Sequence, residues 1–415
     1  MQAEGLQGQE IIGALMTPAG RGDPYALYAA ARKLGPVFGG ADLGMYVCTG
    51  HDEVNAVLRS PEFGKFEREQ IIEGWQESLV EGGSVDTISR SILDANPPDH
   101  RRVRSLISSA FTPRRIAGLE PAITRVADQL LDELERRGSR GEPVDFMEYV
   151  AFRLPVTVIC ELLGVPEEDR ARFRPLAHDL TVALELIDDL AKLAPADAAA
   201  LELRAYFEKL TAQRRAQPAD DLVSALVQVN SADDGRLSDV ELIVNLTLLL
   251  VAGFETTTNL LGNGLELALK RPAVKKGLAG GGIPVEDFVE EVLRYDSPVQ
   301  LTMRVALTDE ARIGGQRLKR GEQVLLLIGA ANRDPARYPD PESFDPLRPD
   351  SAPLSFGGGI HYCLGQGLAR LEAQIAFSRL FQRFPEIRAV AEPVRSDRLV
   401  LRGYERLEVV LREGE

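Results

Sequence analysis

Apolar side chains recur along most of this chain at the three-to-four-residue spacing of an α-helix. Strand-like runs are short, and most of them come late. The helical spacing covers 24–34, 51–59, 99–111, 113–137, 147–163, 167–230 with a break near Pro195, 237–270, 285–295 and 364–384, and the strand-like runs are 37–38, 45–49, 299–307, 311–313, 323–327 and 399–410. The pattern predicts a mainly α fold with a small β portion. We expect one large domain over 21–415, preceded by a loosely ordered arm over 1–20.

Composition narrows the class of protein. The 415 residues include 48 basic and 63 acidic side chains, for a net charge of −15, which argues against general nucleic-acid binding. The best uninterrupted apolar run, 246–254, is too short to span a membrane. Three distant cysteines do not make a disulfide framework. We therefore expect a cytoplasmic protein that is soluble, with no membrane or nucleic-acid partner.

One glycine-rich stretch, residues 356–365, delivers a cysteine to the start of a helical pattern. A thiolate at a helix N-terminus lies at the positive end of the helix dipole, which favours its ligand form and lowers its pKa. Consecutive glycines let the backbone pass close to a flat group and leave N–H groups free to face the sulfur. A structural zinc needs more ligands than Cys363 offers, whereas a haem needs one. The alternative is that Cys363 is simply a buried cysteine in a glycine-rich loop. Cys160 lies in an apolar run and Cys48 in a strand-like run, and both are expected to be core residues.

The spacing of Phe356, Gly359, Cys363 and Gly365 resembles the haem-ligand loop of the cytochrome P450 superfamily. The resemblance extends from about Asp23 to Val410 and is strongest to soluble bacterial members that tailor secondary metabolites. It implies the cytochrome P450 fold, haem b as cofactor and Cys363 as the iron ligand. The same resemblance assigns cofactor contacts to the loop residues Phe356, Gly357 and Gly365 and propionate contacts to His100, Arg104, Arg304 and His361.

The longest helical pattern carries a second motif, Ala252-Gly253-Phe254-Glu255-Thr256-Thr257. By themselves these residues allow a plain interpretation, in which the glutamate is solvated and the threonine bonds back to its own helix. The motif also resembles the oxygen-activation motif of the P450 superfamily. That resemblance implies that Ala252 and Gly253 lie beside the oxygen site and that Glu255 and Thr256 deliver protons.

Glu291 and Arg294 lie three apart on one predicted helix face, a spacing that by default gives only a weak surface pair. The family carries a Glu-x-x-Arg at this place, completed by an arginine upstream of the cysteine loop. The resemblance therefore implies a buried structural network of Glu291, Arg294 and Arg348.

Taken together, the resemblance predicts a haem-thiolate monooxygenase that uses O2 on a small-molecule organic substrate. We expect no fused reductase domain, so NAD(P)H electrons are expected to come through a separate ferredoxin and ferredoxin reductase, and we expect a monomer. Two alternatives stay open: a peroxide-using haem-thiolate enzyme and a non-catalytic haem-binding protein.

Two surfaces follow from the same comparison of motifs. A hydrophobic pocket for a bulky substrate, such as a polyketide, macrolide or terpenoid, is expected to be lined by Ile92, Leu93, Leu249, Ala252, Val299, Thr302 and Val400. A docking patch for an acidic ferredoxin is expected at Arg101, Arg102, Arg114 and Arg115. His51 and His178 match no motif and are expected to be surface or cap residues.

Overall fold

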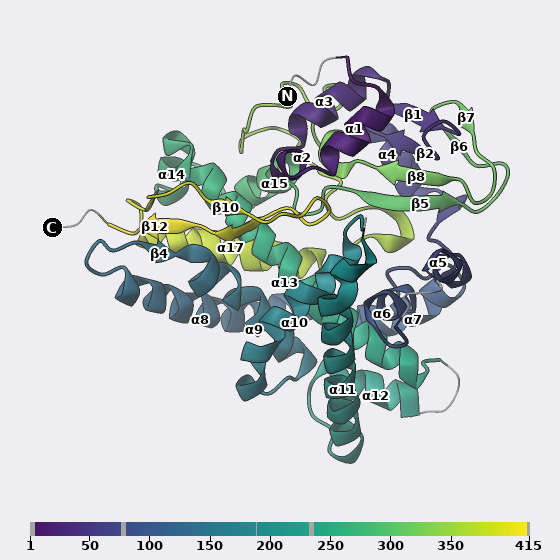
Figure 1. The fold of residues 1–415 in the computed structure, drawn as a ribbon. Helices are drawn as coiled ribbons and strands as arrows, with labels where there is room; N and C mark the ends of the chain where they lie inside the picture. Colours follow the sequence, from purple (N-terminus) through teal and green to yellow (C-terminus); the bar gives the residue numbers. More distant parts are fainter. Residues whose placement is uncertain (1–4, 76–79, 188, 232–235, 413–415) are drawn as a thin grey trace.

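The structure is a computed structural model that describes residues 5–75, 80–187, 189–231 and 236–412, with the side chains of 72–75 outside the description. Helices make up most of it (Figure 1). The α-helices are α1 (Gly8–Leu15), α2 (Pro18–Gly22), α3 (Tyr25–Lys33), α4 (His51–Arg59), α5 (Arg68–Trp75), α6 (Ser84–Ser89), α7 (Asp99–Ile107), α8 (Pro113–Arg137), α9 (Arg153–Leu163), α10 (Arg170–Leu180), α11 (Ala194–Ala216), α12 (Leu222–Ser231), α13 (Asp239–Leu269), α14 (Pro272–Ala279), α15 (Val285–Tyr295), α16 (Ile328–Ala331) and α17 (Gln366–Arg383).

The strands form small sheets at one side of the helices and along the C-terminal segment (Figure 1). The largest sheet has the order β1-β2-β8-β5-β3, in which only β2 and β8 run parallel. The strands are β1 (Val37–Gly40), β2 (Met45–Cys48), β3 (Phe63–Gly64), β4 (Val144–Asp145), β5 (Thr302–Ala306), β6 (Arg312–Ile313), β7 (Gln316–Arg317), β8 (Gln323–Leu326), β9 (Arg388–Ala389), β10 (Val394–Arg395), β11 (Tyr404–Arg406) and β12 (Glu408–Val410). The predicted mainly α fold with a minor β portion is confirmed.

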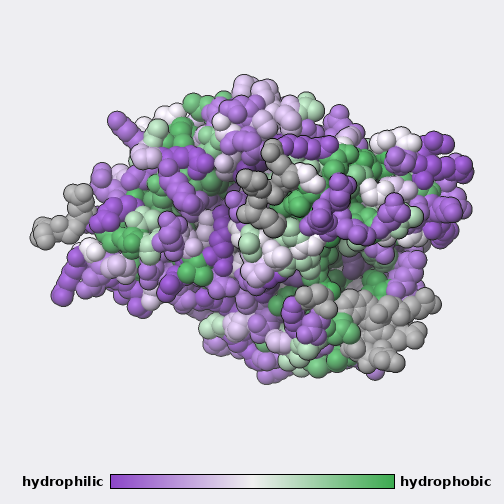
Figure 2. Space-filling model, turned by 45° about the horizontal axis from the view of Figure 1, so that its top comes forward, coloured by the Kyte–Doolittle hydropathy of each residue, from purple (hydrophilic) through white to green (hydrophobic). Residues whose placement is uncertain are grey.

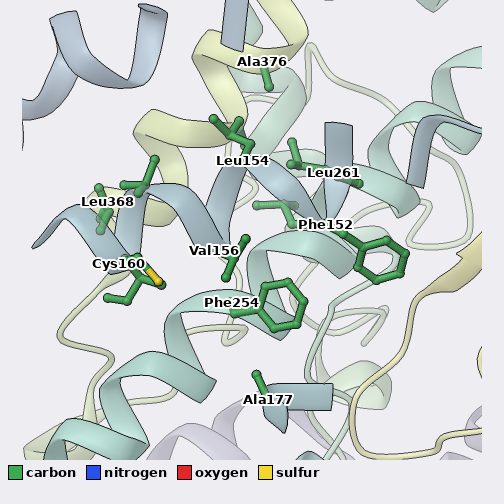
Figure 3. Close-up of a cluster of buried hydrophobic side chains, with 14 of the residues drawn as sticks. Phe152, Leu154, Val156, Cys160, Ala177, Phe254, Leu261, Leu368 and Ala376 are labelled. Atoms are coloured by element: carbon green, nitrogen blue, oxygen red, sulfur yellow. The ribbon is translucent and has the colours of Figure 1, made fainter. Parts of the chain in front are cut away.

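Helix α13 runs through the middle of the helical part, with α9, α10, α11 and α17 packed around it. Its start is the predicted capping box, since the Ser238 hydroxyl accepts from the Glu241 amide and the Glu241 carboxylate accepts from Ser238. Figure 3 shows side chains of α9, among them Cys160, packed in the same apolar cluster as Phe254 of α13. Cys160 and Cys48 are both fully buried, as expected of core residues.

Helix α13 is also the one described helix that is long and apolar enough to cross a membrane by length and composition. In its most apolar window, however, 67% of the residues are buried inside the protein. The surface in Figure 2 is covered mainly by hydrophilic residues, with apolar residues in small groups between them. Burial therefore explains the apolar character of α13, which serves as the central helix of the core.

The expectation of a loosely ordered arm over 1–20 is wrong for the described part of that segment. Residues 8–15 form α1, whose Ile11 and Leu15 are buried in a cluster with α3 and the β1–β2 side of the large sheet. Helix α2 follows, capped by the Thr17 hydroxyl, which accepts from the Gly20 amide. The apolar positions of this segment are few and closely spaced, so their helical periodicity is weak in the sequence, and tertiary burial stabilises the helices.

Candidate functional site

The cysteine loop is closed by its own backbone. The Cys363 amide donates to the Phe356 carbonyl at 3.0 Å, so the segment between them forms a tight bend that ends at α17. The Phe356 ring lies under the Arg370 guanidinium, 4.3 Å from its carbon to the ring centroid. Cys363 is partly buried at the N-terminal side of α17, where the sequence predicted it.

Two competing effects act on the Cys363 thiol. Burial raises its pKa, while hydrogen bonds from the Gly365 and Gln366 amides and the charges of Arg104 and Arg370 lower it. Burial is the larger effect, so the protein groups alone do not give the lowered pKa that the sequence argument expected. The amides that face the sulfur follow the cysteine and belong to the first turn of α17 rather than to the three glycines before it.

The glycines serve a different contact. A Cβ on Gly359 would collide with the Leu58 carbonyl, and one on Gly358 would lie 3.2 Å from the Leu58 Cβ, both at the end of α4. Gly357 and Gly359 also have φ values of 71° and 62°, a region that side chains other than glycine's rarely adopt. The glycine run therefore allows the loop to turn tightly and to pack on α4.

Four residues predicted to contact carboxylates gather near Cys363. The rings of His100 and His361 are 4.4 Å apart, and three of their four ring nitrogens have no hydrogen-bond partner among the described residues: both of His100 and Nε2 of His361. Arg304 is 4% exposed, and within the part of the chain that the structure describes it donates to Thr302 and to the Met303 carbonyl.

Arg104 and Arg304 carry the positive charge of this cluster, because the low pKa values of the two histidines leave their rings neutral at neutral pH. Burial lowers the pKa of His100 to about 4, helped by Arg104 and Arg101, and lowers that of His361 to about 2, helped by Arg304 and Lys65. Burial also lowers the pKa of Arg304 to about 10. Buried cations that face one another without matching carboxylates are costly, so the cluster is suited to a ligand with two negative charges.

The Glu291 carboxylate is the centre of a buried network. Arg294 donates to both of its oxygens at 2.7 and 2.8 Å, and both side chains are fully buried. The Arg348 Nε lies 3.5 Å away, and the Asp345 amide donates to the same carboxylate at 2.8 Å. Arg294 also donates to three backbone carbonyls, those of Asn332, Pro341 and Ser343. The structure thus brings the three predicted residues together and ties them to the segment before the cysteine loop.

Helix α13 is buried on most of its surface, but one stripe is accessible. Ala252 is exposed, and Leu248 and Thr256, each one turn away, are partly exposed on the same face. The Thr256 hydroxyl donates to the Ala252 carbonyl at 2.9 Å, the back-bond of the plain interpretation. Packing explains the glycine at position 253, because a Cβ there would lie 3.1 Å from the Ile159 side chain of α9.

Glu255 points away from that stripe. It is 3% exposed, and its Oε2 has no hydrogen-bond partner among the described residues. His178 of α10 lies next to it: the His178 Nδ1 is 3.7 Å from Oε2, and the His178 side chain is 39% exposed. His178 Nε2 in turn lies 3.3 Å from an Arg398 nitrogen. Sequence reasoning missed His178 because α10 and α13 are far apart in the chain and no local motif marks the contact.

The predicted pocket residues lie in several environments. Ile92, Leu249 and Val400 are 7, 8 and 8% exposed and belong to the core clusters, whereas Leu93, Val299 and Thr302 are partly exposed and Ala252 is exposed. On α13 the accessible position is Leu248 rather than Leu249.

A separate cavity of about 280 Å³ opens between α6, α11 and the first turns of α13. None of the seven predicted pocket residues lines it. Its wall includes the ion pairs Asp86–Arg90, Arg204–Glu208 and Arg215–Asp239, so it is a polar cavity rather than the predicted apolar pocket.

The four predicted docking arginines differ in how they are held. Arg101, Arg114 and Arg115 are exposed. Arg102 donates to Asp99 at 2.7 Å and to Glu241 at 2.5 Å, and these two carboxylates raise its pKa. Arg102 therefore joins α7 to the cap of α13, so its contacts are those of a structural residue rather than of a free docking residue.

Comparison with known proteins decides the family. The family model for cytochrome P450 matches residues 31–279 and 285–399. The chain belongs to the cytochrome P450 family. It is 38% identical over 400 residues to vitamin D(3) 25-hydroxylase of Pseudonocardia autotrophica, covering 94% of each chain. It is 36% identical over 398 residues to 6-deoxyerythronolide B hydroxylase of Saccharopolyspora erythraea, covering 94% of this chain and 96% of that protein.

A solved structure agrees. Ligand-free CYP164A2 of Mycobacterium smegmatis superposes with a TM-score of 0.87 at 37% identity, covering 97% of this chain and 100% of that one. This chain is accordingly a cytochrome P450 monooxygenase, an oxidoreductase with the P450 fold. The P450 family binds haem, and the residues present fit that group: one cysteine sulfur met by two amides, beside unpartnered histidine nitrogens and a buried arginine that faces no carboxylate within hydrogen-bond distance.

The Glu291 network gives a stability prediction. Arg294→Met should lower the free energy of unfolding by about 3–5 kcal/mol, because it leaves the Glu291 carboxylate buried without its bidentate partner. Urea unfolding followed by circular dichroism measures the change. Arg317→Met, which removes an exposed pair with Glu310, is the matched control and should leave the unfolding midpoint unchanged. Equal midpoints for both variants would show that the network does not stabilise the fold.

Proposed function

We propose that this P450 inserts one oxygen atom of O2 into a C–H or C=C bond of a bulky, largely hydrophobic organic substrate. Electrons would come from NAD(P)H through a separate ferredoxin and ferredoxin reductase. We further propose a monomer in the cytoplasm that tailors a secondary metabolite. One observation carries the choice of O2 over peroxide: α13 places a buried carboxylate with an unpartnered oxygen next to a hydroxyl on its accessible stripe.

The haem, when bound through Cys363, would supply the site at which O2 is bound and reduced. The Gly365 and Gln366 amides would donate hydrogen bonds to the sulfur, and the bound iron would add the positive charge that keeps it a thiolate. His100, Arg104, Arg304 and His361 would bind the two propionates. The stripe of Leu248, Ala252 and Thr256 would face oxygen and substrate, with the small Ala252 side chain leaving room for both.

Glu255 and His178 together offer a proton path from solvent. Arginine has no acceptor, so the contact between Arg398 and His178 Nε2 makes that nitrogen the acceptor, and the neutral ring then carries its proton on Nδ1. That proton faces the Glu255 carboxylate across 3.7 Å, a gap that one water or a small side-chain rotation closes. The partly exposed histidine would thus reprotonate a buried acid from the surface.

The Thr256 hydroxyl would hold the proton donor at the oxygen site. Thr256→Ala should still bind haem and substrate, but protons would reach the reduced oxygen at the wrong place or time. We expect less product and more hydrogen peroxide per NAD(P)H consumed. Thr256→Ser, which keeps the hydroxyl, should restore most of the coupling. Equal product yields per NAD(P)H for wild type and Thr256→Ala would reject this role.

The His178 path makes a separate prediction. His178→Phe should slow product formation and enlarge the solvent deuterium isotope effect on turnover, because proton supply to Glu255 becomes limiting. His178→Gln keeps a polar side chain and is expected to have a smaller effect. His51→Gln is the control, since the recorded neighbours of the His51 side chain are Asp52 and Tyr338 and do not include Glu255. Unchanged isotope effects in His178→Phe would remove His178 from the path.

The substrate proposal rests on the apolar stripe of α13 and on the relatives, one named for vitamin D(3) and one for 6-deoxyerythronolide B. Sterol-sized and macrolactone ligands should shift the haem absorption band, whereas small charged metabolites should not. Leu248→Asn should weaken binding of the apolar ligands roughly tenfold. Val390→Asn, at an exposed position after β9, should not change it. Tight selective binding of a small charged metabolite would contradict the proposed substrate class.

An acidic ferredoxin would dock at the exposed arginines of α7 and α8. Changing Arg101, Arg114 and Arg115 to Glu should slow the first electron transfer at low ionic strength, and added salt should shrink the difference. Arg102 is left in place because it holds the α13 cap. Changing the exposed Arg136, Arg140 and Arg406 to Glu alters net charge equally, and Arg136 lies roughly 35 Å along α8 from its start. Equal rates in both triple variants would place the docking face elsewhere.

A further inference from the structure

Lys65 is a buried cation that the family motifs leave without a role. Its side chain is 12% exposed, and its Nζ lies 3.2 Å from the Asp94 carboxylate. Its backbone is fixed as well, because the Lys65 amide donates to the Asn96 side chain at 2.9 Å and the Lys65 carbonyl accepts from it at 2.8 Å. The strand β3 immediately before it therefore sets where the side chain points.

Strand register places Lys65 beside Arg304. Strands β3 and β5 are antiparallel, with Phe63 opposite Ala306 and Gly64 opposite Val305. Continuing this register by one residue sets Lys65 opposite Arg304, and residues opposite one another project from the same face of a sheet. The charges agree with this placement: Arg304 adds to the burial that lowers the pKa of Lys65, and Lys65 adds to the burial that lowers the pKa of His361.

Like charges directly opposite one another are destabilising, and burial increases the cost. Among the described residues, Asp94 is the one carboxylate that raises the pKa of Lys65 or Arg304, so a single negative charge meets two cations. Lys65 has three N–H donors, of which one suffices for Asp94. A further anion between Lys65 and Arg304 would balance the remaining positive charge.

We propose that Lys65 is a further haem-propionate ligand of this chain, binding the propionate that Arg304 and His361 bind, while its ammonium keeps its ion pair with Asp94. The inference rests on the proposed haem site. Removing this positive charge should weaken retention of the cofactor and lower the reduction potential of the haem, because a nearby cation favours the reduced form, which carries one positive charge fewer.

The test compares haem-loaded wild type, Lys65→Met, Lys65→Arg and Asp94→Asn. Haem transfer to excess apomyoglobin gives the rate of haem loss, and spectroelectrochemical titration gives the reduction potential. Lys65→Met should lose haem roughly tenfold faster, the loss of one charged hydrogen bond, and should have a lower potential. Lys65→Arg should restore both values. Lys209→Met, at an exposed position on α11, should match wild type.

Asp94→Asn separates this role from a merely structural ion pair. It breaks the same Lys65–Asp94 pair but leaves the lysine charge beside the propionate, so haem loss should stay near the wild-type rate and the potential should not fall. If Lys65→Met and Asp94→Asn change both values alike, or if Lys65→Met matches Lys209→Met, the proposal is overturned. A wild type that binds no haem would instead overturn the proposed function itself, so the two failures are distinguishable.

Discussion

The position of the Cys363 sulfur is the constraint on which the site depends. The sulfur lies where a closed bend meets the first turn of α17, with two amides of that turn directed at it. Because burial raises the pKa of the thiol, the amides and the nearby arginines alone do not hold it ionised. An iron ion bound to the sulfur, as we propose, would supply the missing positive charge, as metals do for coordinating thiols. In the proposed function, the cofactor would therefore complete the charge of this sulfur site.

The rest of the architecture holds that sulfur in relation to two other groups. The Glu291 network fixes the segment that leads into the loop, and the glycines let the loop rest on α4. Strand β5 carries Arg304 into the cationic cluster, while α13 carries Glu255 and Thr256 through the core. Helix α10 then links Glu255 to the surface through His178. In the proposed function, cofactor binding, proton supply and substrate contact would thus come from separate elements packed around one helix.

Much of the fold and of the candidate site was predictable because the residues concerned lie close together in short sequence motifs. The helix over 285–295, the capping box at Ser238 and the cysteine loop each depend on residues a few positions apart. The predictions that were wrong, and the residues that the sequence did not reveal, depend on tertiary contacts. Helix α1 forms because Ile11 and Leu15 are buried against the sheet side, and the glycine run is explained by α4, which lies about 300 residues earlier. His178 and Lys65 acquire a role only through neighbours from other elements.

The central claim is that Cys363, and no other cysteine, ligates the haem iron. The most direct measurement is the absorption spectrum of the reduced protein with carbon monoxide, recorded for wild type and for single cysteine variants. The account predicts a thiolate-type band in wild type, in Cys48→Ser and in Cys160→Ala, and its loss in Cys363→Ser. A thiolate-type band that persists in Cys363→Ser would contradict the account.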